Sequence, residues 1–138
     1  MLVLHAAFCA IVVRVSLRVG SLPFAVRAAR IAGWLCRTRA STDECYEAAA
    51  VASRRLAHAT CLYRALIAYA LLVHRQSDTQ FHVGAVRGAQ GPLRRTVPVG
   101  AGFSRPVGVM GAHAWVTING RAIDADARRY ATLWTARG

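Results

Sequence analysis

Residues 62–73 constrain the fold more than any other segment, because they are mostly apolar and contain neither glycine nor proline. Thr60 stands just before them and is a residue type that caps helices by accepting a hydrogen bond from a backbone N–H. This pattern predicts a largely buried helix whose first residue is Cys61. A thiol at that position lies near unpaired N–H groups and the positive end of the helix dipole, which favour the thiolate. Cys61 is therefore a candidate nucleophile.

A second segment, residues 112–126, predicts a β-hairpin. Asn119-Gly120 is a strong two-residue turn signal, and β-forming residues flank it at 116–118 and 121–123. Such a turn pairs position 118 with 121 and position 113 with 126. Because side chains alternate along a strand, His113 shares one face with Asp124 and Asp126. Asp126 is then directly opposite the imidazole and Asp124 is diagonal to it.

A thiol, an imidazole and a carboxylate in this order can form a thiolate–imidazolium pair oriented by an acid, which can attack a carbonyl carbon. We predict Cys61, His113 and Asp124 as the catalytic residues, with Asp126 as the alternative acid, because Asp124 is the one still inside the predicted strand. Trp115 either shields the imidazole from water or is an ordinary core residue. The side chains expected to line the cleft are those of Trp115, Thr60 and Arg64.

Residues 60–66, with the sequence Thr-Cys-Leu-Tyr-Arg-Ala-Leu, and residues 112–116, with Ala-His-Ala-Trp-Val, carry a resemblance to a known family. Together with the hairpin they resemble the transglutaminase-like cysteine peptidase half of the lasso-peptide B protein, over roughly residues 40–130. The resemblance implies an α+β, papain-like fold in which N-terminal helices and a nucleophile helix pack on a small antiparallel sheet. Thr117 stands where the family usually has a glutamate, and we expect this to be surface variation.

The resemblance also implies an activity: Cys61 attacks one peptide bond of a ribosomally made lasso peptide precursor, and a thioester forms while the leader is being removed. It implies a cytoplasmic enzyme with no metal or organic cofactor. A separate small leader-recognition protein would deliver the precursor, and an ATP-dependent lasso cyclase would close the released core. The expected oxyanion donor is the backbone N–H of Cys61 with an unassigned neighbour, because every glutamine lies downstream of this cysteine.

Two other functions stay open at this point. The same residues could transfer an acyl group to an amine, as transglutaminases and arylamine N-acetyltransferases do. Alternatively, the chain could be a non-enzymatic, basic protein-binding module, since 18 arginines face only six acids and the net charge is +12. Nucleic acid is not the expected partner, because the arginines are scattered and aromatic residues do not interleave with them. The charge either keeps the protein soluble or complements an acidic partner.

The length of 138 residues predicts a single domain, with an N-terminal helical segment at 1–40 and a catalytic core at 41–138. The cysteines are too widely spaced for a zinc-type cluster. We expect the three that are not the nucleophile to be reduced core residues: Cys9, Cys36 and Cys45.

The N-terminal segment predicts two helices, over residues 2–19 and 23–36. Its opening apolar run of about 13 residues is too short to span a bilayer, and positive charge follows it rather than precedes it, unlike an export signal. The 55% hydrophobic content predicts exposed apolar surface and hence a partner. Packing against the catalytic core or a partner protein is favoured over attachment to a membrane surface.

The remaining patterns place further elements. Ser41 and Glu44 form a capping box that opens a helix to about residue 58, with Cys45, Ala48, Ala49, Ala52 and Leu56 on its apolar face. Residues 81–87 alternate as a strand, and 88–111 predict a loop beside the cleft with short edge segments at 96–99 and 106–109. Leu133 and Trp134 are expected to pack on the core. The histidines for which structural roles are expected are His5, His58, His74 and His82.

Overall fold

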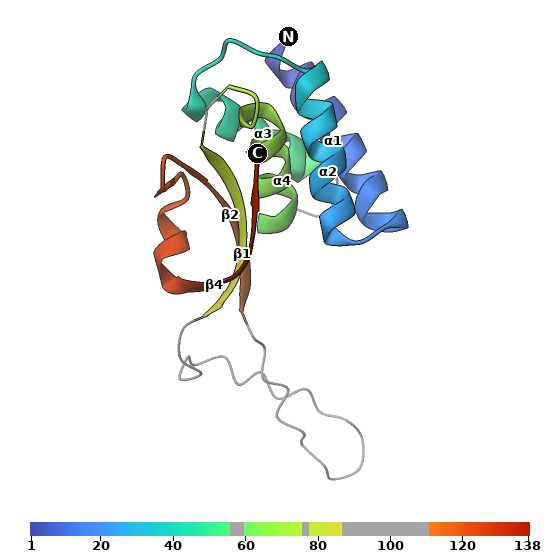
Figure 1. Cartoon of the computed structure of the whole chain (residues 1–138). Helices are drawn as coiled ribbons and strands as arrows, with labels where there is room; N and C mark the ends of the chain where they lie inside the picture. The colour runs from blue at the N-terminus through green and yellow to red at the C-terminus, as the bar shows by residue number, and fades with distance from the viewer. Residues whose placement is uncertain (56–59, 76–77, 87–110) are drawn as a thin grey trace.

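The computed structural model describes residues 1–55, 60–75, 78–86 and 111–138. Within these residues, four helices are combined with a four-stranded antiparallel sheet in the order β3-β2-β1-β4, as an α+β fold. Helix α4 packs against strands β1 and β2, and the other three helices pack around it. The short 3-10 helix η1 lies on the opposite side of the sheet from α1 and α2 (Figure 1).

Helix α4, Cys61–Leu72, is the centre of the core. Its residues from Ala65 to Leu72 are all buried, and the predicted cap is present, because Thr60 Oγ1 accepts a hydrogen bond from the backbone N–H of Tyr63 at 3.4 Å. The side of α4 that faces the sheet brings Tyr69 edge-on to Phe81, with ring centroids 6.1 Å apart. The predicted buried helix beginning at Cys61 is therefore confirmed.

Three further helices precede α4: α1 at Leu2–Val19, α2 at Leu22–Leu35 and α3 at Thr42–Arg55. All three were predicted within a few residues. The capping box of α3 is present, because the Ser41 N–H donates to Glu44 Oε2 at 2.6 Å and the Glu44 N–H donates to Ser41 Oγ at 3.3 Å. The predicted apolar face of α3 is buried as far as Ala52, whereas Leu56 and His58 lie outside the described residues.

Strand β1, Thr79–Val86, pairs with β2, Ala112–Ile118, so that Gly84 is opposite His113. The predicted hairpin is confirmed in its register, because Ile118 pairs with Arg121 in β3, Arg121–Ala122. The turn has the two positive φ angles of a type I′ hairpin, 51° at Asn119 and 74° at Gly120.

The prediction that Asp124 lies inside the second hairpin strand is wrong. Strand β3 ends at Ala122, and the last cross-strand hydrogen bond runs from the Ile123 N–H to the Val116 carbonyl at 3.0 Å. Asp124 instead caps η1, Ala125–Arg129, because its Oδ1 accepts the backbone N–H of Asp126 at 3.0 Å. This local bond from side chain to backbone turns the chain out of the sheet.

Strand β4, Tyr130–Arg137, pairs with the other edge of β1. Trp134 packs on the core with its ring 6.1 Å from that of Phe81, as predicted. Leu133 was predicted to do the same and does not, since it is 69% exposed. The register passes from Trp134 opposite Val83 to Thr132 opposite Gly84, so Leu133 is the extra residue of a β-bulge and has no partner in β1.

Helix α1 is longer than the 13-residue apolar run read from the sequence, since it continues to Val19. Among the described helices, it is the one that could cross a membrane by length and composition, with a mean hydropathy of 1.9 over 18 residues. Part of it is buried against α2, α3 and α4, as the sequence predicted for packing on the core. The expected loop and edge segments between residues 88 and 110 lie outside the described residues.

Candidate active site

Three elements bring the predicted site residues to one end of the molecule. Cys61 is the first residue of α4, His113 is the second residue of β2, and Asp124 is the cap of η1. The Cys61 Sγ atom lies 4.0 Å from the carbonyl oxygen of Ala112, the residue just before His113. The start of α4 therefore abuts the start of the strand that carries the imidazole.

His113 and Asp124 are in direct contact. The imidazole Nε2 lies 3.0 Å from Asp124 Oδ2, and the two side chains are only 10% and 12% exposed. Asp126, the alternative acid, was predicted to lie opposite His113, but β3 ends before it can. Its carboxylate points away and is 3.9 Å from the Arg129 side chain, 66% exposed. Of the two aspartates, Asp124 is thus the partner of the imidazole.

The environment of Asp124 keeps its carboxylate ionised. Burial alone would raise the pKa of Asp124, but the hydrogen bond from the Asp126 N–H, the hydrogen bond with His113 and the charge of Arg64 together lower it below the ordinary value. An ionised carboxylate can hold a proton on the facing imidazole nitrogen and stabilise the imidazolium when it forms.

Arg64 connects α4 to this carboxylate. One guanidinium nitrogen of Arg64 lies 3.0 Å from Asp124 Oδ2, the same oxygen that faces His113. The guanidinium also lies over the ring of Tyr46, 5.3 Å from its centroid. The sequence placed Arg64 at the cleft, one helical turn after Cys61, but gave no sign of its contact with Asp124, which depends on where β3 ends.

Aromatic rings enclose the imidazole on the same face of the sheet. The Tyr130 ring stacks on His113 with centroids 4.6 Å apart, and Trp115 is nearly parallel to it at 6.0 Å. Trp115 is buried beside the imidazole and does not belong to the core cluster around α4, which argues against the ordinary core role considered from the sequence. Tyr130 was missed, because it reaches His113 only through the pairing of β4 with β1 and of β1 with β2.

His82 extends this cluster and has a structural position. Its ring stacks on Trp115 at 5.4 Å, its Nε2 lies 2.9 Å from Thr117 Oγ1, and its Nδ1 lies 3.0 Å from Thr135 Oγ1. Burial lowers the pKa of His82, which favours the neutral ring. Thr117 is therefore not surface variation: it is 8% exposed and hydrogen-bonded to His82.

Other histidines expected to be structural lie away from this site. His74 Nε2 lies 2.9 Å from the carbonyl oxygen of Arg30, which links the end of α4 to α2. In His5, Nδ1 is buried and has no hydrogen-bond partner among the described residues.

The thiol and the imidazole are not in contact in the described residues, because His113 shares a sheet face with Trp115 and Tyr130, whereas Ala114 and Val116 on the other face pack in the core with α4. Within the described part of the chain, the hydrogen-bond contact of Cys61 Sγ is with the Ala112 carbonyl, and none joins it to His113. With Nε2 of His113 on Asp124, Nδ1 is the nitrogen left to take a proton. Cys61 is half-buried, whereas the other three cysteines are buried and free, as predicted.

The first-turn position of Cys61 has a second consequence. Its N–H has no carbonyl of the same helix to bond, because the first four N–H groups of a helix lack such partners. This N–H is an available oxyanion donor. Gln80 is not one, since its amide nitrogen donates to Asp78 at 2.7 Å, and the other two glutamines lie outside the described residues.

Across residues 1–55, 60–75, 78–86 and 111–138, no three His, Cys, Asp or Glu side chains are grouped so that they could hold a metal ion. No protein-family model, curated protein or solved structure matches this chain. The chemistry of the site therefore rests on its own geometry: a carboxylate, the imidazole hydrogen-bonded to it, and a thiol at a helix N-terminus that reaches the start of the same strand.

Proposed function

We propose that this chain is a cysteine peptidase with a transglutaminase-like, papain-like fold, which removes the leader from a lasso peptide precursor. The observation that carries the proposal is the hydrogen bond between His113 and Asp124 at the start of β2, next to a capped helix that begins with Cys61. The local sequences around Cys61 and His113, which resemble that peptidase family, give the substrate class.

The first half of the reaction begins at the thiol. Asp124 accepts a hydrogen bond from the Nε2–H of His113, so Nδ1 can accept the proton of Cys61 once the thiol moves from the Ala112 carbonyl to the ring. The sulfur then attacks the scissile carbonyl carbon, and the N–H of Cys61 stabilises the oxyanion. The imidazolium gives its proton to the departing amine, which is the N-terminus of the core peptide, and the leader stays on Cys61 as a thioester.

In the second half, His113 accepts a proton from water, and the resulting hydroxide attacks the thioester carbon. The C–S bond breaks, the sulfur regains a proton from the imidazolium, and the leader departs with a new carboxylate. The proposed reaction requires neither a metal nor an organic cofactor. A separate leader-recognition protein presents the precursor in the cytoplasm, and an ATP-dependent cyclase consumes the released core.

The experiment is the incubation of a lasso precursor and its recognition protein with this chain, followed by mass spectrometry of the peptides. Cleavage is expected with the wild type, and a loss of about 10³-fold or more in rate is expected for Cys61→Ala, His113→Ala and Asp124→Asn. Asp126→Asn is the matched control and should cleave like the wild type.

Three outcomes would contradict the proposal. If Cys61→Ala still cleaved the precursor, the thiol would not be the nucleophile. If the wild type joined the leader to an added amine and released no free leader acid, the chain would be an acyltransferase instead. A folded wild-type protein that binds the precursor without changing it would be the basic binding module.

A further inference from the structure

The outer side of the N-terminal helical pair is apolar and exposed. Of the twelve large hydrophobic residues exposed in the described part of the chain, eleven precede residue 36 and one, Leu133, lies elsewhere. We call the ten of them that belong to the two helices the outer face: Val3, Leu4, Phe8, Ile11, Val15 and Val19 of α1, and Phe24, Ile31, Trp34 and Leu35 of α2.

The outer face is separate from the sides of these helices that build the core. Small side chains such as Ala6, Cys9 and Ala29 are completely buried, where α1 and α2 pack on each other and on α4. The two helices lie side by side, on the far side of the molecule from η1 (Figure 1). The packing of the core therefore does not use the outer face, which is an apolar surface that extends about 27 Å along α1.

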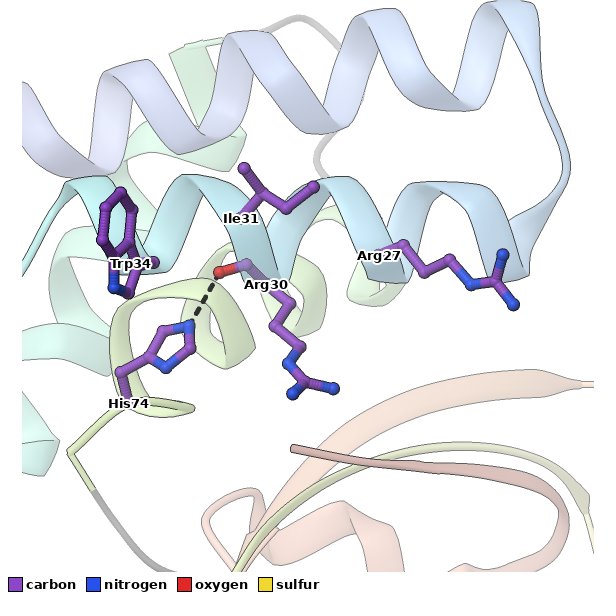
Figure 2. Close-up of a pocket in the computed structure, with 5 residues that line it drawn as sticks. All are labelled: Arg27, Arg30, Ile31, Trp34 and His74. Atoms are coloured by element: carbon purple, nitrogen blue, oxygen red, sulfur yellow. Dashed lines mark hydrogen bonds between the residues drawn. The ribbon is translucent and has the colours of Figure 1, made fainter.

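The charged side chains of the segment that carries the outer face are all positive. Residues 1–42 contain six arginines and no aspartate or glutamate. A groove of about 400 Å³ beside the outer face is lined by Arg27, Arg30, Ile31, Trp34 and His74. Figure 2 shows Arg27 and Arg30 both extending from α2, Arg30 on the side of His74 and Arg27 toward the end of the helix far from Trp34. Among the described residues, neither guanidinium has an ion pair or a hydrogen bond.

We propose that the outer face binds the surface of an anionic lipid bilayer, with α1 and α2 lying flat. From Val3 to Val15 the exposed side chains of α1 are all apolar and present no hydrogen-bonding group. A protein partner ordinarily makes about one hydrogen bond per 100–200 Å² of interface, whereas hydrocarbon requires none. The arginines attract anionic headgroups, and Trp34 is suited to the headgroup level.

A flat orientation fits better than a spanning one. If α1 crossed the bilayer, it would leave the contacts in which Ala6, Cys9 and Val13 are buried, and it would carry Arg14 and Arg18 toward the hydrocarbon. Lying flat, α1 keeps its core contacts and buries only side chains that are already exposed. The sequence favoured packing of these helices on the core or on a partner over attachment to a membrane. Their inner sides do pack on the core, but the outer face stays exposed.

The test is flotation of the full chain with vesicles of phosphatidylcholine alone or of phosphatidylcholine with about 25% phosphatidylglycerol. We expect binding to the anionic vesicles to be at least about tenfold tighter and to weaken at high salt, because salt screens the arginines. Phe8→Ser with Ile11→Ser should reduce binding by about tenfold or more. Leu133→Ser, at a more exposed site outside the outer face, is the control and should bind like the wild type.

The arginines have their own pair of variants. Arg27→Gln with Arg30→Gln should weaken binding by about fivefold per charge, whereas Arg121→Gln with Arg137→Gln, which removes the same charge from the sheet, should change it less. Circular dichroism checks that each variant keeps its helices. Precursor cleavage in solution should be unchanged in all of them, so this proposal can fail while the peptidase proposal stands.

Three results would overturn the proposal: no binding to either vesicle, equal binding to both, or equal binding by the Phe8 and Leu133 variants. A dimer in size-exclusion chromatography that Phe8→Ser with Ile11→Ser dissociates, without vesicle binding by the wild type, would assign the outer face to a second copy of the chain. Vesicle-independent capture of an acidic protein through the outer face would assign it to a protein partner.

Discussion

At the residue scale, Asp124 links two tasks through its two carboxylate oxygens. One oxygen accepts the Asp126 N–H and ends the hairpin by capping η1, while the other faces both Arg64 and His113. The local turn therefore positions the acid, and the ionic contact with Arg64 ties it to the helix that begins with Cys61. A substitution at Asp124 should affect both the stability of the fold and the orientation of the imidazole.

The pH dependence of stability follows from the lowered pKa of Asp124. Because the folded state favours the ionised carboxylate, the stabilisation is fully present above the unfolded pKa of about 3.9 and is lost as pH falls through the folded value. In urea unfolding, we expect wild type to be more stable than Asp124→Asn at pH 6, and the difference to shrink below about pH 4. The exposed Asp126→Asn is the control. A difference that is constant, or grows, on acidification would contradict this account of Asp124.

At the element scale, the approach of α2 to α4 requires a residue without a side chain. A Cβ at Gly33 would overlap the backbone carbonyl oxygen of Ala70, which belongs to a helix with no room to shift in the core. In an exposed helix, Gly to Ala is stabilising by about 1 kcal/mol. At this position overpacking of backbone against backbone should dominate that gain.

We therefore expect Gly33→Ala to lower the free energy of unfolding by about 1–3 kcal/mol, measured by urea denaturation. The sign is diagnostic, since helix propensity alone predicts the opposite change. Equal or greater stability of the variant would mean that α2 does not lie this close to α4.

The elements predicted from the sequence were those specified by neighbouring residues. The capping residues Thr60 and Ser41 marked two helix starts, and Asn119-Gly120 marked the hairpin and its register. The end of β3 was missed, because the capping bond of Asp124 competes with the next rungs of the ladder and alternation cannot reveal it. The pairing of β4 with β1 joins residues about 50 positions apart, so neither the strand nor the bulge at Leu133 had a local signal.

The same contrast between local sequence signals and long-range contacts applies to the candidate site. Cys61 and His113 came from short motifs and their order, whereas Asp124 was preferred as the acid because it was placed inside the second hairpin strand, where the structure does not have it. The contacts that enclose these residues did not come from such motifs: Arg64 reaches Asp124 across 60 residues, and Tyr130 reaches His113 through two strand pairings. These contacts depend on the assembled sheet and on η1, whose positions the sequence pattern left open.

At the scale of the whole molecule, the thiol site and the outer face lie on different parts of one domain. The outer face consists of exposed apolar side chains of α1 and α2, while Cys61 lies where α4 meets β2. Attachment through the outer face would leave the thiol end accessible to a delivered peptide. The other three thiols are buried inside the domain, and burial raises the pKa of both Cys9 and Cys45. Cys61 is therefore the cysteine that a reagent can report on in the folded protein.

The most direct measurement is the rate at which iodoacetamide alkylates each cysteine of the folded protein near pH 6.5, followed by peptide mapping. It requires no precursor or partner. In the proposed mechanism the imidazole of His113 accepts the proton of the thiol, so we expect Cys61 to react at least about tenfold faster in the wild type and in Asp126→Asn than in His113→Ala. Alkylation of Cys61 at one and the same rate in the wild type and in His113→Ala would contradict the activation of this thiol by His113.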